Sequence, residues 1–253
     1  MRILGISGKK QSGKNTFANY INGRVMLSMG MIRDFYVDVD NKGELVIETT
    51  NASGEIGWGV FDVTRKDHGF TEYAERELWP YVKLYSFADG LKSLCMEFFG
   101  LSPEQVYGTD EHKNTTTEIK WEDVPTWENS SLNKNRGNMT ARELMQYFGT
   151  DIMRRMYEPV HINHALNKVK SEQSQVAIIP DVRFPNEVEA IKKAGGNVVR
   201  LTRVFNEEDS HPSETALDEE NFDWGNFDFV LENNCPAGEF IPIVEQFYNK
   251  NFI

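Results

Sequence analysis

Close to the N-terminus stands a glycine-rich loop that restricts the possible folds of this chain more than any other stretch: Gly8-Lys9-Lys10-Gln11-Ser12-Gly13-Lys14-Asn15-Thr16. It fits the pattern G-x-x-x-x-G-K, follows an apolar strand-like run at residues 2–7, and precedes a helix expected from Lys14 to about Asn22. Glycine lets such a loop wrap its backbone closely around phosphate oxygens. The following helix offers free N–H groups and a positive dipole end to the same anion. The sequence therefore predicts a phosphate-binding loop, which we weigh above a glycine-rich turn without a ligand.

Strand-like and helical segments alternate along the rest of the chain. Strands are expected at residues 2–7, 81–86, 176–179, 198–201 and 227–231. Helices are expected around residues 91–99, from Thr140 onward, and at residues 186–194 and 236–248. Thr140 with Glu143 forms a capping box at the start of the second of these helices. This alternation predicts an α/β fold with a mainly parallel sheet and right-handed crossovers.

Two stretches depart from the alternation. Residues 24–80 contain strand-like runs at 35–40, 44–48 and 57–63, and we interpret them as a β-rich insertion. Residues 204–222 are polar and acidic and form a candidate lid or loop segment. No internal repeat is present, so residues 1–253 are interpreted as a single domain with these two additions.

Composition excludes several classes of function. Lys and Arg total 27 against 39 Asp and Glu, a net charge of −12, which disfavours a nucleic-acid partner. A small anionic ligand stays compatible, because a local pocket can be positive on a negative protein. The two cysteines lack metal-ligand spacing, and no run approaches the roughly 18 apolar residues of a membrane span. We therefore expect a soluble cytoplasmic protein without a membrane or nucleic-acid partner.

Within the loop, Lys14 is expected to bridge the β- and γ-phosphates of a nucleotide. The common pattern places Ser or Thr directly after this lysine as a Mg²⁺ ligand, but here Asn15 stands there and Thr16 follows. This Lys-x-Thr arrangement resembles the loop of nucleoside monophosphate kinases such as adenylate kinase. Whether Thr16 contacts the metal ion or a phosphate oxygen is left open.

A second group of candidate residues lies in the helix after Thr140. At 100° per residue, Arg142, Gln146 and Gly149 share one stripe, with Thr150 beside it. Glycine costs a helix interior about 1 kcal/mol relative to alanine. Gly149 therefore indicates close approach of a ligand or, alternatively, tight packing against another helix.

Further candidates follow the predicted strands, where open α/β sheets bind their ligands. Asp181 and Arg183 come directly after the strand at 176–179, and Arg183 could hold a phosphate in a bidentate manner. The alternative is an Asp–Arg pair that only fixes the loop. Arg203 follows the next strand and precedes the acidic stretch, which could equally be a solvated loop. Lys113 could meet an acceptor phosphate or lie on solvated helix surface.

Together these residues resemble the phage-type deoxynucleoside monophosphate kinases of the P-loop nucleoside monophosphate kinase superfamily. The likeness covers most of the chain and rests on four motifs, which are Ser7 to Thr16, Leu144-Met145-Gln146 with Gly149-Thr150-Asp151, Pro180-Asp181-Val182-Arg183 with Glu187, and His211-x-Ser213-Glu214. The P-loop is shared by many families, whereas the run ending at Asp151 is more specific. The stretch 24–80 has no clear counterpart there.

The resemblance implies a P-loop NTPase-type three-layer fold, Mg-ATP as phosphoryl donor, Mg²⁺ as cofactor and a homodimer. It assigns to ATP the loop residues Gly8, Lys10, Ser12, Gly13, Lys14, Asn15 and Thr16, with Thr16 as the candidate metal ligand. It assigns to the acceptor nucleotide Lys113, Arg142, Gln146, Gly149, Thr150, Asp181 and Glu187. Lys14, Arg183 and Arg203 would gather around the transferring group.

The expected reaction is ATP + dNMP = ADP + dNDP, which supplies dNTP synthesis, of a phage in the host cell cytoplasm if the chain is phage-encoded. One rival is another P-loop kinase, for instance one acting on dephospho-coenzyme A, against which the Gly149-Thr150-Asp151 run argues. A second rival is a nucleotide-dependent switch or assembly factor, which only the 24–80 stretch favours.

Overall fold

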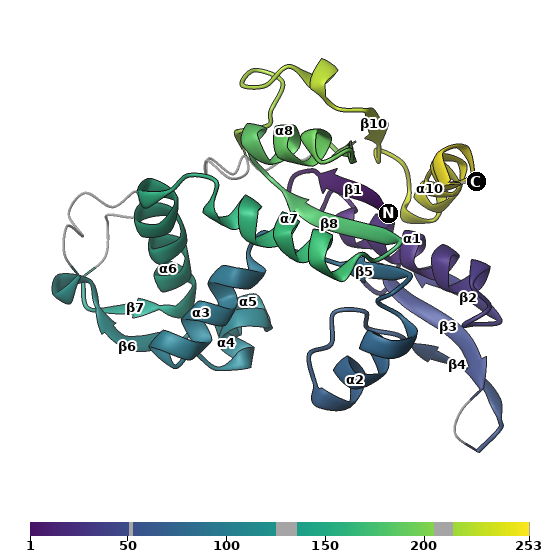
Figure 1. Ribbon diagram of the computed structural model, residues 1–253, viewed down its shortest axis with the longest axis horizontal. Coiled ribbons are helices and arrows are strands. Elements are labelled where there is room, and N and C mark those ends of the chain that lie inside the picture. Colours follow the sequence, from purple (N-terminus) through teal and green to yellow (C-terminus); the bar gives the residue numbers. More distant parts are fainter. Residues whose placement is uncertain (51–52, 125–135, 205–214, 253) are drawn as a thin grey trace. The chain divides into compact units, whose positions relative to one another are not determined.

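The computed structural model of the chain describes residues 1–50, 53–124, 136–204 and 215–252 (Figure 1). They form two compact units. The first unit combines Met1–Ser86 with Lys168–Ile253, and the second unit is Phe87–Asn167. Among the described residues, no helix has both the length and the apolar character that crossing a lipid bilayer requires.

A five-stranded sheet forms the centre of the first unit. Its strands lie in the order β10-β9-β1-β8-β5, and every neighbouring pair is parallel. The strands are β1 (Arg2–Ser7), β5 (Val82–Leu84), β8 (Val176–Val182), β9 (Asn197–Thr202) and β10 (Phe229–Glu232). The carboxyl ends of parallel strands meet at one edge, and β1 ends in the middle of that edge between β8 and β9. The sheet confirms the predicted α/β fold.

Helices cover both faces of this sheet. Leu4 and Ile6 of β1 belong to the buried cluster that includes residues of α1 (Lys14–Ser28) and α10 (Ala237–Phe252). The residue between them, Gly5, faces the other way, and a Cβ atom there would lie 2.7 Å from Ile191 of α8 (Pro185–Lys193). Helix α1 is longer than predicted, because its buried residues continue through Val25 and Met26. The three layers agree with a P-loop NTPase-type fold.

The stretch between α1 and β5 contains a second sheet and a helix. The antiparallel strands β2 (Asp34–Asp38), β3 (Glu44–Thr50) and β4 (Ile56–Val60) lie in chain order, and α2 (His68–Glu77) follows. Val37, Leu45 and Ile47 join the buried cluster beside α1, so one face of this sheet completes the core. The three predicted strands are present, although the last ends at Val60, and α2 was not predicted.

The second unit is mostly helical. It contains α3 (Asp89–Phe99), α4 (Pro103–Tyr107), α5 (Asp110–Lys113), β6 (Thr116–Lys120), η1 (Trp121–Asp123), β7 (Asn138–Thr140), α6 (Ala141–Gln146), the π-helix η3 (Tyr147–Arg154) and most of α7 (Val160–Glu172). Strands β6 and β7 pair antiparallel, and Cys95, Val106, Trp121, Met139 and Leu144 are among the buried core residues.

Sequence patterns predicted the start of α6 and the end of α3, but not the exposure of the last residues of α3. The capping box between Thr140 and Glu143 is present as expected. In α3, Cys95 is buried, but Phe98 is 65% exposed and Phe99 is also exposed. The helix ends at Phe99, as predicted, and Gly100 caps it in a left-handed conformation, but its last apolar residues do not belong to the buried core of the second unit.

Candidate functional site

The predicted phosphate-binding loop, residues 8–16 and called the phosphate loop below, runs from the end of β1 to the first turn of α1. Close contacts explain the two glycines of its G-x-x-x-x-G-K pattern. Gly13, the residue before α1, has a φ of 96°, and a Cβ there would lie 2.6 Å from Nδ2 of Asn233. A Cβ on Gly8 would collide with the Ser12 hydroxyl. Any larger residue at either position would force the loop to open.

Lys14 folds back over its own loop. Its Nζ atom donates to the carbonyl oxygens of Gly8 at 2.5 Å and of Lys9 at 2.6 Å. The ammonium group is thereby held where the loop backbone turns inward, and its three N–H donors can exchange carbonyl oxygens for phosphate oxygens. This geometry suits the phosphate-bridging role predicted for Lys14.

Ser12 occupies the closed side of the loop. Its side chain is buried, and within the described part of the chain no atom hydrogen-bonds to its hydroxyl. Its carbonyl oxygen accepts a hydrogen bond of 3.0 Å from Nδ2 of the buried Asn233. The backbone N–H of Asn233 in turn donates to Thr202 at the end of β9. Asn233 thus joins the ends of β9 and β10 to the loop, and the sequence reasoning missed it.

The first turn of α1 contacts the β2–β3 turn. Asn15 is exposed, whereas the Thr16 hydroxyl lies directly against Gly43, where an added Cβ would collide with it. Asn19 donates a hydrogen bond of 2.7 Å to the Gly43 carbonyl oxygen. The residues between α1 and β5 therefore support the helix that carries the phosphate loop.

The end of β8 lies beside the loop, because Val182 pairs with Ser7. The register of the two strands shifts at this point, and such irregularities re-aim side chains. The Asp181 carboxylate accepts a hydrogen bond of 2.5 Å from the hydroxyl of Ser86. The buried Glu187 carboxylate accepts from the backbone N–H groups of Arg183 at 2.7 Å and of Phe184 at 3.1 Å. Glu187 therefore shapes the loop that carries Arg183.

Arg203 also reaches the phosphate loop, where its guanidinium donates to the Gln11 carbonyl oxygen at 3.3 Å. Gln11 itself has a φ of 64°, a left-handed conformation that non-glycine residues seldom adopt. Of the segment 204–222, residues 205–214 lie outside the described residues, and so do His211, Ser213 and Glu214. The first unit thus gathers the predicted ATP residues with Asp181, Arg183, Glu187 and Arg203 at one edge of its sheet.

The other predicted residues lie in the second unit. The Arg142 guanidinium of α6 donates to the Asp110 carboxylate at 2.6 Å and to the Asn114 side-chain oxygen at 3.1 Å. Asp110 begins α5 and Asn114 follows it, so Lys113 stands between the two partners of Arg142 in the chain. These contacts bring Arg142 to the short helix that carries Lys113.

A π-helix changes the stripe that was predicted for α6. From Tyr147 to Arg154 the helix has π geometry, so 100° per residue holds only as far as Gln146. Gly149 is buried while Thr150 is exposed, and a Cβ on Gly149 would lie 2.5 Å from Leu91. Its carbonyl oxygen lies 3.1 Å from Nε2 of the buried His161. The contact with Leu91 gives packing as one reason for the glycine. The π-helix leaves the other reason, close approach of a ligand, in place, because π-helices concentrate at functional sites.

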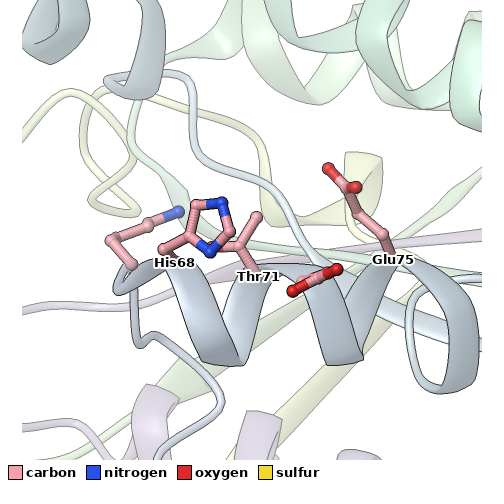
Figure 2. A pocket seen from close by; sticks show the side chains of 5 residues that line it. His68, Thr71 and Glu75 are labelled. Carbon is pink, nitrogen blue, oxygen red and sulfur yellow. The ribbon is translucent and has the colours of Figure 1, made fainter.

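A hollow of about 480 Å³ lies elsewhere, over helix α2 (Figure 2). Its lining side chains are polar, and three of them, His68, Thr71 and Glu75, project from the same helix. None of the predicted site residues lines it. Within the described ranges no group of three or more His, Cys, Asp or Glu residues could hold a metal ion.

Comparison with known proteins gives one matching family and two relatives. The family model "Deoxynucleotide monophosphate kinase" matches residues 59–240. A protein of Acanthamoeba polyphaga mimivirus, "Putative deoxynucleotide monophosphate kinase", is 32% identical over 168 residues, which cover 61% of this chain and 77% of the relative. The "Deoxynucleoside-5'-monophosphate kinase" of Escherichia phage T5 is 28% identical over 88 residues, which cover 31% of this chain and 35% of the relative.

Proposed function

Because the chain belongs to the deoxynucleotide monophosphate kinase family, we propose that it transfers the γ-phosphoryl group of Mg-ATP to a deoxynucleoside monophosphate, releasing ADP and dNDP. The family makes it a phosphotransferase. The donor is proposed from one observation above all, the phosphate loop whose Lys14 rests on the carbonyl oxygens of Gly8 and Lys9. This loop precedes the region that the family model matches, so the loop supports the proposal independently.

In this proposal the loop residues bind the β- and γ-phosphates through backbone N–H groups and Lys14. Arg203 beside Gln11 and Arg183 beside the end of β8 supply further positive charge to the transferring group. Phosphoryl transfer passes through a loose transition state, so positioning and charge neutralisation carry the catalysis. No strong general base is required, because the acceptor phosphate is already an anion.

Mg²⁺ would enter with ATP, where it neutralises charge on the β- and γ-phosphates. The side chains near the loop suit this hard cation, since Thr16, Asn15 and Asp181 all offer oxygen atoms. Magnesium keeps several waters and takes one or two protein ligands beside the phosphates, so a preformed carboxylate cluster is not needed. We propose Thr16 as the protein ligand; its hydroxyl would have to share its contact with Gly43.

In the second unit, the acceptor nucleotide is proposed to bind Lys113, Arg142, Gln146, Gly149 and Thr150. The acceptor contacts expected of Asp181 and Glu187, which belong to the first unit, stay predictions. Arg142 is the strongest candidate, because a guanidinium held by Asp110 and Asn114 is oriented before the ligand arrives. Both relatives are viral, and this supports action in the cytoplasm of an infected host cell. By the family likeness we also propose a homodimer.

The test is acceptor-dependent ADP release from Mg-ATP. Each of dAMP, dCMP, dGMP and dTMP is offered beside the matching ribonucleotides and a control without acceptor. We expect release with one or more deoxynucleotides, formation of the matching dNDP, and little ADP without an acceptor. ADP release that ignores the acceptor would instead favour a nucleotide-dependent switch. Release with dephospho-coenzyme A but with no nucleotide would favour the rival kinase.

A further inference from the structure

A chain of polar contacts links the phosphate loop to the segment before β10. The Nζ atom of Lys9 lies 2.8 Å from one carboxylate oxygen of Asp218. The other oxygen lies 3.3 Å from the guanidinium of Arg200, which also donates to the Ser7 hydroxyl at 2.9 Å. Ser7 ends β1 and pairs with Arg200 of β9, so the contacts begin and end beside the loop. All four residues belong to the first unit.

The Asp218 carboxylate is held in place by the buried Arg200. The Arg200 side chain is only 6% exposed, and its guanidinium lies over the rings of Trp224 at 5.4 Å and Phe227 at 6.0 Å. A buried cation needs a charged partner, and Asp218 supplies it. Backbone hydrogen bonds hold Asp218 in place, since its N–H donates to Thr215 and its carbonyl oxygen accepts from Asn221 and Phe222. The carboxylate is therefore a rigid anchor.

Lys9 connects Asp218 to the backbone of the phosphate loop. The Lys9 side chain is held by Asp218, while its carbonyl oxygen accepts both from Nζ of Lys14 at 2.6 Å and from the N–H of Ser12 at 3.2 Å. Fixing Lys9 thus restricts the loop at the residue on which Lys14 rests. A loop ordered before its ligand arrives binds more tightly, because less conformational entropy is lost on binding.

We propose that Asp218 is a positioning residue, which holds Lys9 and so keeps the phosphate loop in the shape that a triphosphate binds. The proposal rests on the proposed function in one respect, that the loop binds ATP. Asp218 touches neither reactant and acts only through Lys9. The opposite possibility is that Asp218 competes with phosphate for the Lys9 ammonium, in which case removing the carboxylate would tighten binding.

The test compares Asp218→Asn, Lys9→Met and the double variant with the wild type. Asparagine keeps one oxygen for Arg200 but turns an amide toward Lys9. Asp228→Asn is the matched control, because Asp228 forms a similarly exposed ion pair with Lys192. Both aspartate side chains are 23% exposed, and the lysine side chains are 38% exposed for Lys192 and 41% for Lys9. Calorimetry measures the binding of Mg-ATP, ADP and inorganic tripolyphosphate in the absence of an acceptor. Steady-state kinetics with a deoxynucleoside monophosphate as acceptor gives kcat and the KM of each substrate. Circular dichroism and thermal unfolding verify that each variant is folded.

We expect Asp218→Asn and Lys9→Met each to weaken binding of all three ligands about three- to fivefold. The double variant should be no weaker than either single one, because both changes break the same link. KM for ATP should rise while kcat and KM for the deoxynucleotide stay close to wild type, and Asp228→Asn should change none of these values.

Three results overturn the proposal while leaving the ATP site intact: unchanged binding in Asp218→Asn, tighter binding in Asp218→Asn, or additive losses in the double variant. If Asp218→Asn fails to fold, unchanged binding in Lys9→Met overturns the proposal by itself. A wild-type protein that binds neither Mg-ATP nor tripolyphosphate overturns the proposed function as well, so the two failures are distinguishable.

Discussion

In the first unit the predicted nucleotide contacts come from one short loop and the strand ends beside it, whereas in the second unit they project from separate helices. The proposed phosphate contacts of the loop come mainly from its backbone, whose path is set by Gly8, Gly13 and the register of β1 against β8 and β9. The candidate acceptor site depends on side chains such as Arg142, which owes its orientation to residues about thirty positions earlier. A backbone site can be recognised from a local motif, while a side-chain site requires the fold.

The units also differ in how strongly each candidate is constrained. Around the phosphate loop, the side chains of Lys14 and Asn233 donate hydrogen bonds of 2.5 to 3.0 Å to the backbone carbonyl oxygens of Gly8, Lys9 and Ser12. In the second unit, Arg142 forms an ion pair whose two side chains are 38% and 63% exposed. Exposed pairs contribute little to stability, so the contact with Asp110 can orient Arg142 and still be exchanged for a ligand at low cost. Substitutions in the two units should therefore affect different substrates.

The largest effect is expected for Lys14→Met. Removing one preorganised hydrogen-bond donor that stabilises the charge of the transition state lowers the rate roughly 10²- to 10³-fold. We expect kcat/KM for ATP to fall by at least this factor. Binding of the deoxynucleotide to the second unit should persist, which equilibrium dialysis with labelled dNMP can measure. Loss of deoxynucleotide binding together with ATP binding would break the assignment of the two substrates to two units.

Next in size is Arg142→Ala. Loss of a charge-assisted contact to the acceptor phosphate should raise KM for the deoxynucleotide about 10- to 100-fold and leave KM for ATP unchanged. Asp110→Asn should have a smaller effect in the same direction, because it releases Arg142 without removing it. The exposed Arg155 provides the control, and Arg155→Ala should match wild type. A change in KM for ATP alone would contradict the acceptor role of Arg142.

Most of the first unit could be predicted from local patterns. The run at residues 176–179 is buried on both faces of the sheet, as a continuous apolar stretch suggests. Helix α2 was missed, because only Phe70 and Ala74 are buried in it and its other side chains are largely polar. The continuation of β8 through Pro180 was also missed, since proline argues against a strand unless the ladder is irregular there.

The site residues that lie in one segment could be predicted from the sequence. Residues that act through contacts between distant segments could be predicted less well. Asn233, Asp218 and Lys9 act through contacts between residues more than 200 positions apart, and no local pattern marks them. The one available signal for Asn233 is its place directly after a strand that ends at the same edge of the sheet. The π-helix around Gly149 could not be foreseen, because helical periodicity assumes 100° per residue.

A smaller effect is expected for Gly149→Ala, which decides between packing and ligand approach in the second unit. The added methyl group would collide with Leu91. Overpacking of this kind typically costs about 1–3 kcal/mol, and we expect the free energy of unfolding to fall by about that amount. Leu91→Ala should then restore most of the lost thermal stability in the double variant. If the double variant regains stability but not its KM for the deoxynucleotide, Gly149 contacts the acceptor as well.

The smallest effect concerns the two cysteines, one in each unit. Cys95 is buried in the core of the second unit, and burial raises the pKa of its thiol to about 11, whereas Cys235 of the first unit is partly exposed. A raised pKa in the folded state means that the unfolded chain loses its proton first. The stabilising contribution of the neutral thiol is therefore complete below about pH 9 and disappears as the pH rises toward 11.

In a Cys235→Ser background, we expect the free energy of unfolding to fall more steeply above pH 9 than in Cys95→Ala/Cys235→Ser. The difference between the two curves should change by roughly 1 kcal/mol between pH 9 and pH 10, measured by urea unfolding at each pH. Subtracting the curves removes the tyrosines and lysines that titrate in the same range. Parallel curves would mean that Cys95 reaches solvent in the folded protein. Since Cys95 lies in the same buried cluster as Leu144 and Tyr147, the helix that carries Arg142 would then be less firmly packed than its contacts indicate.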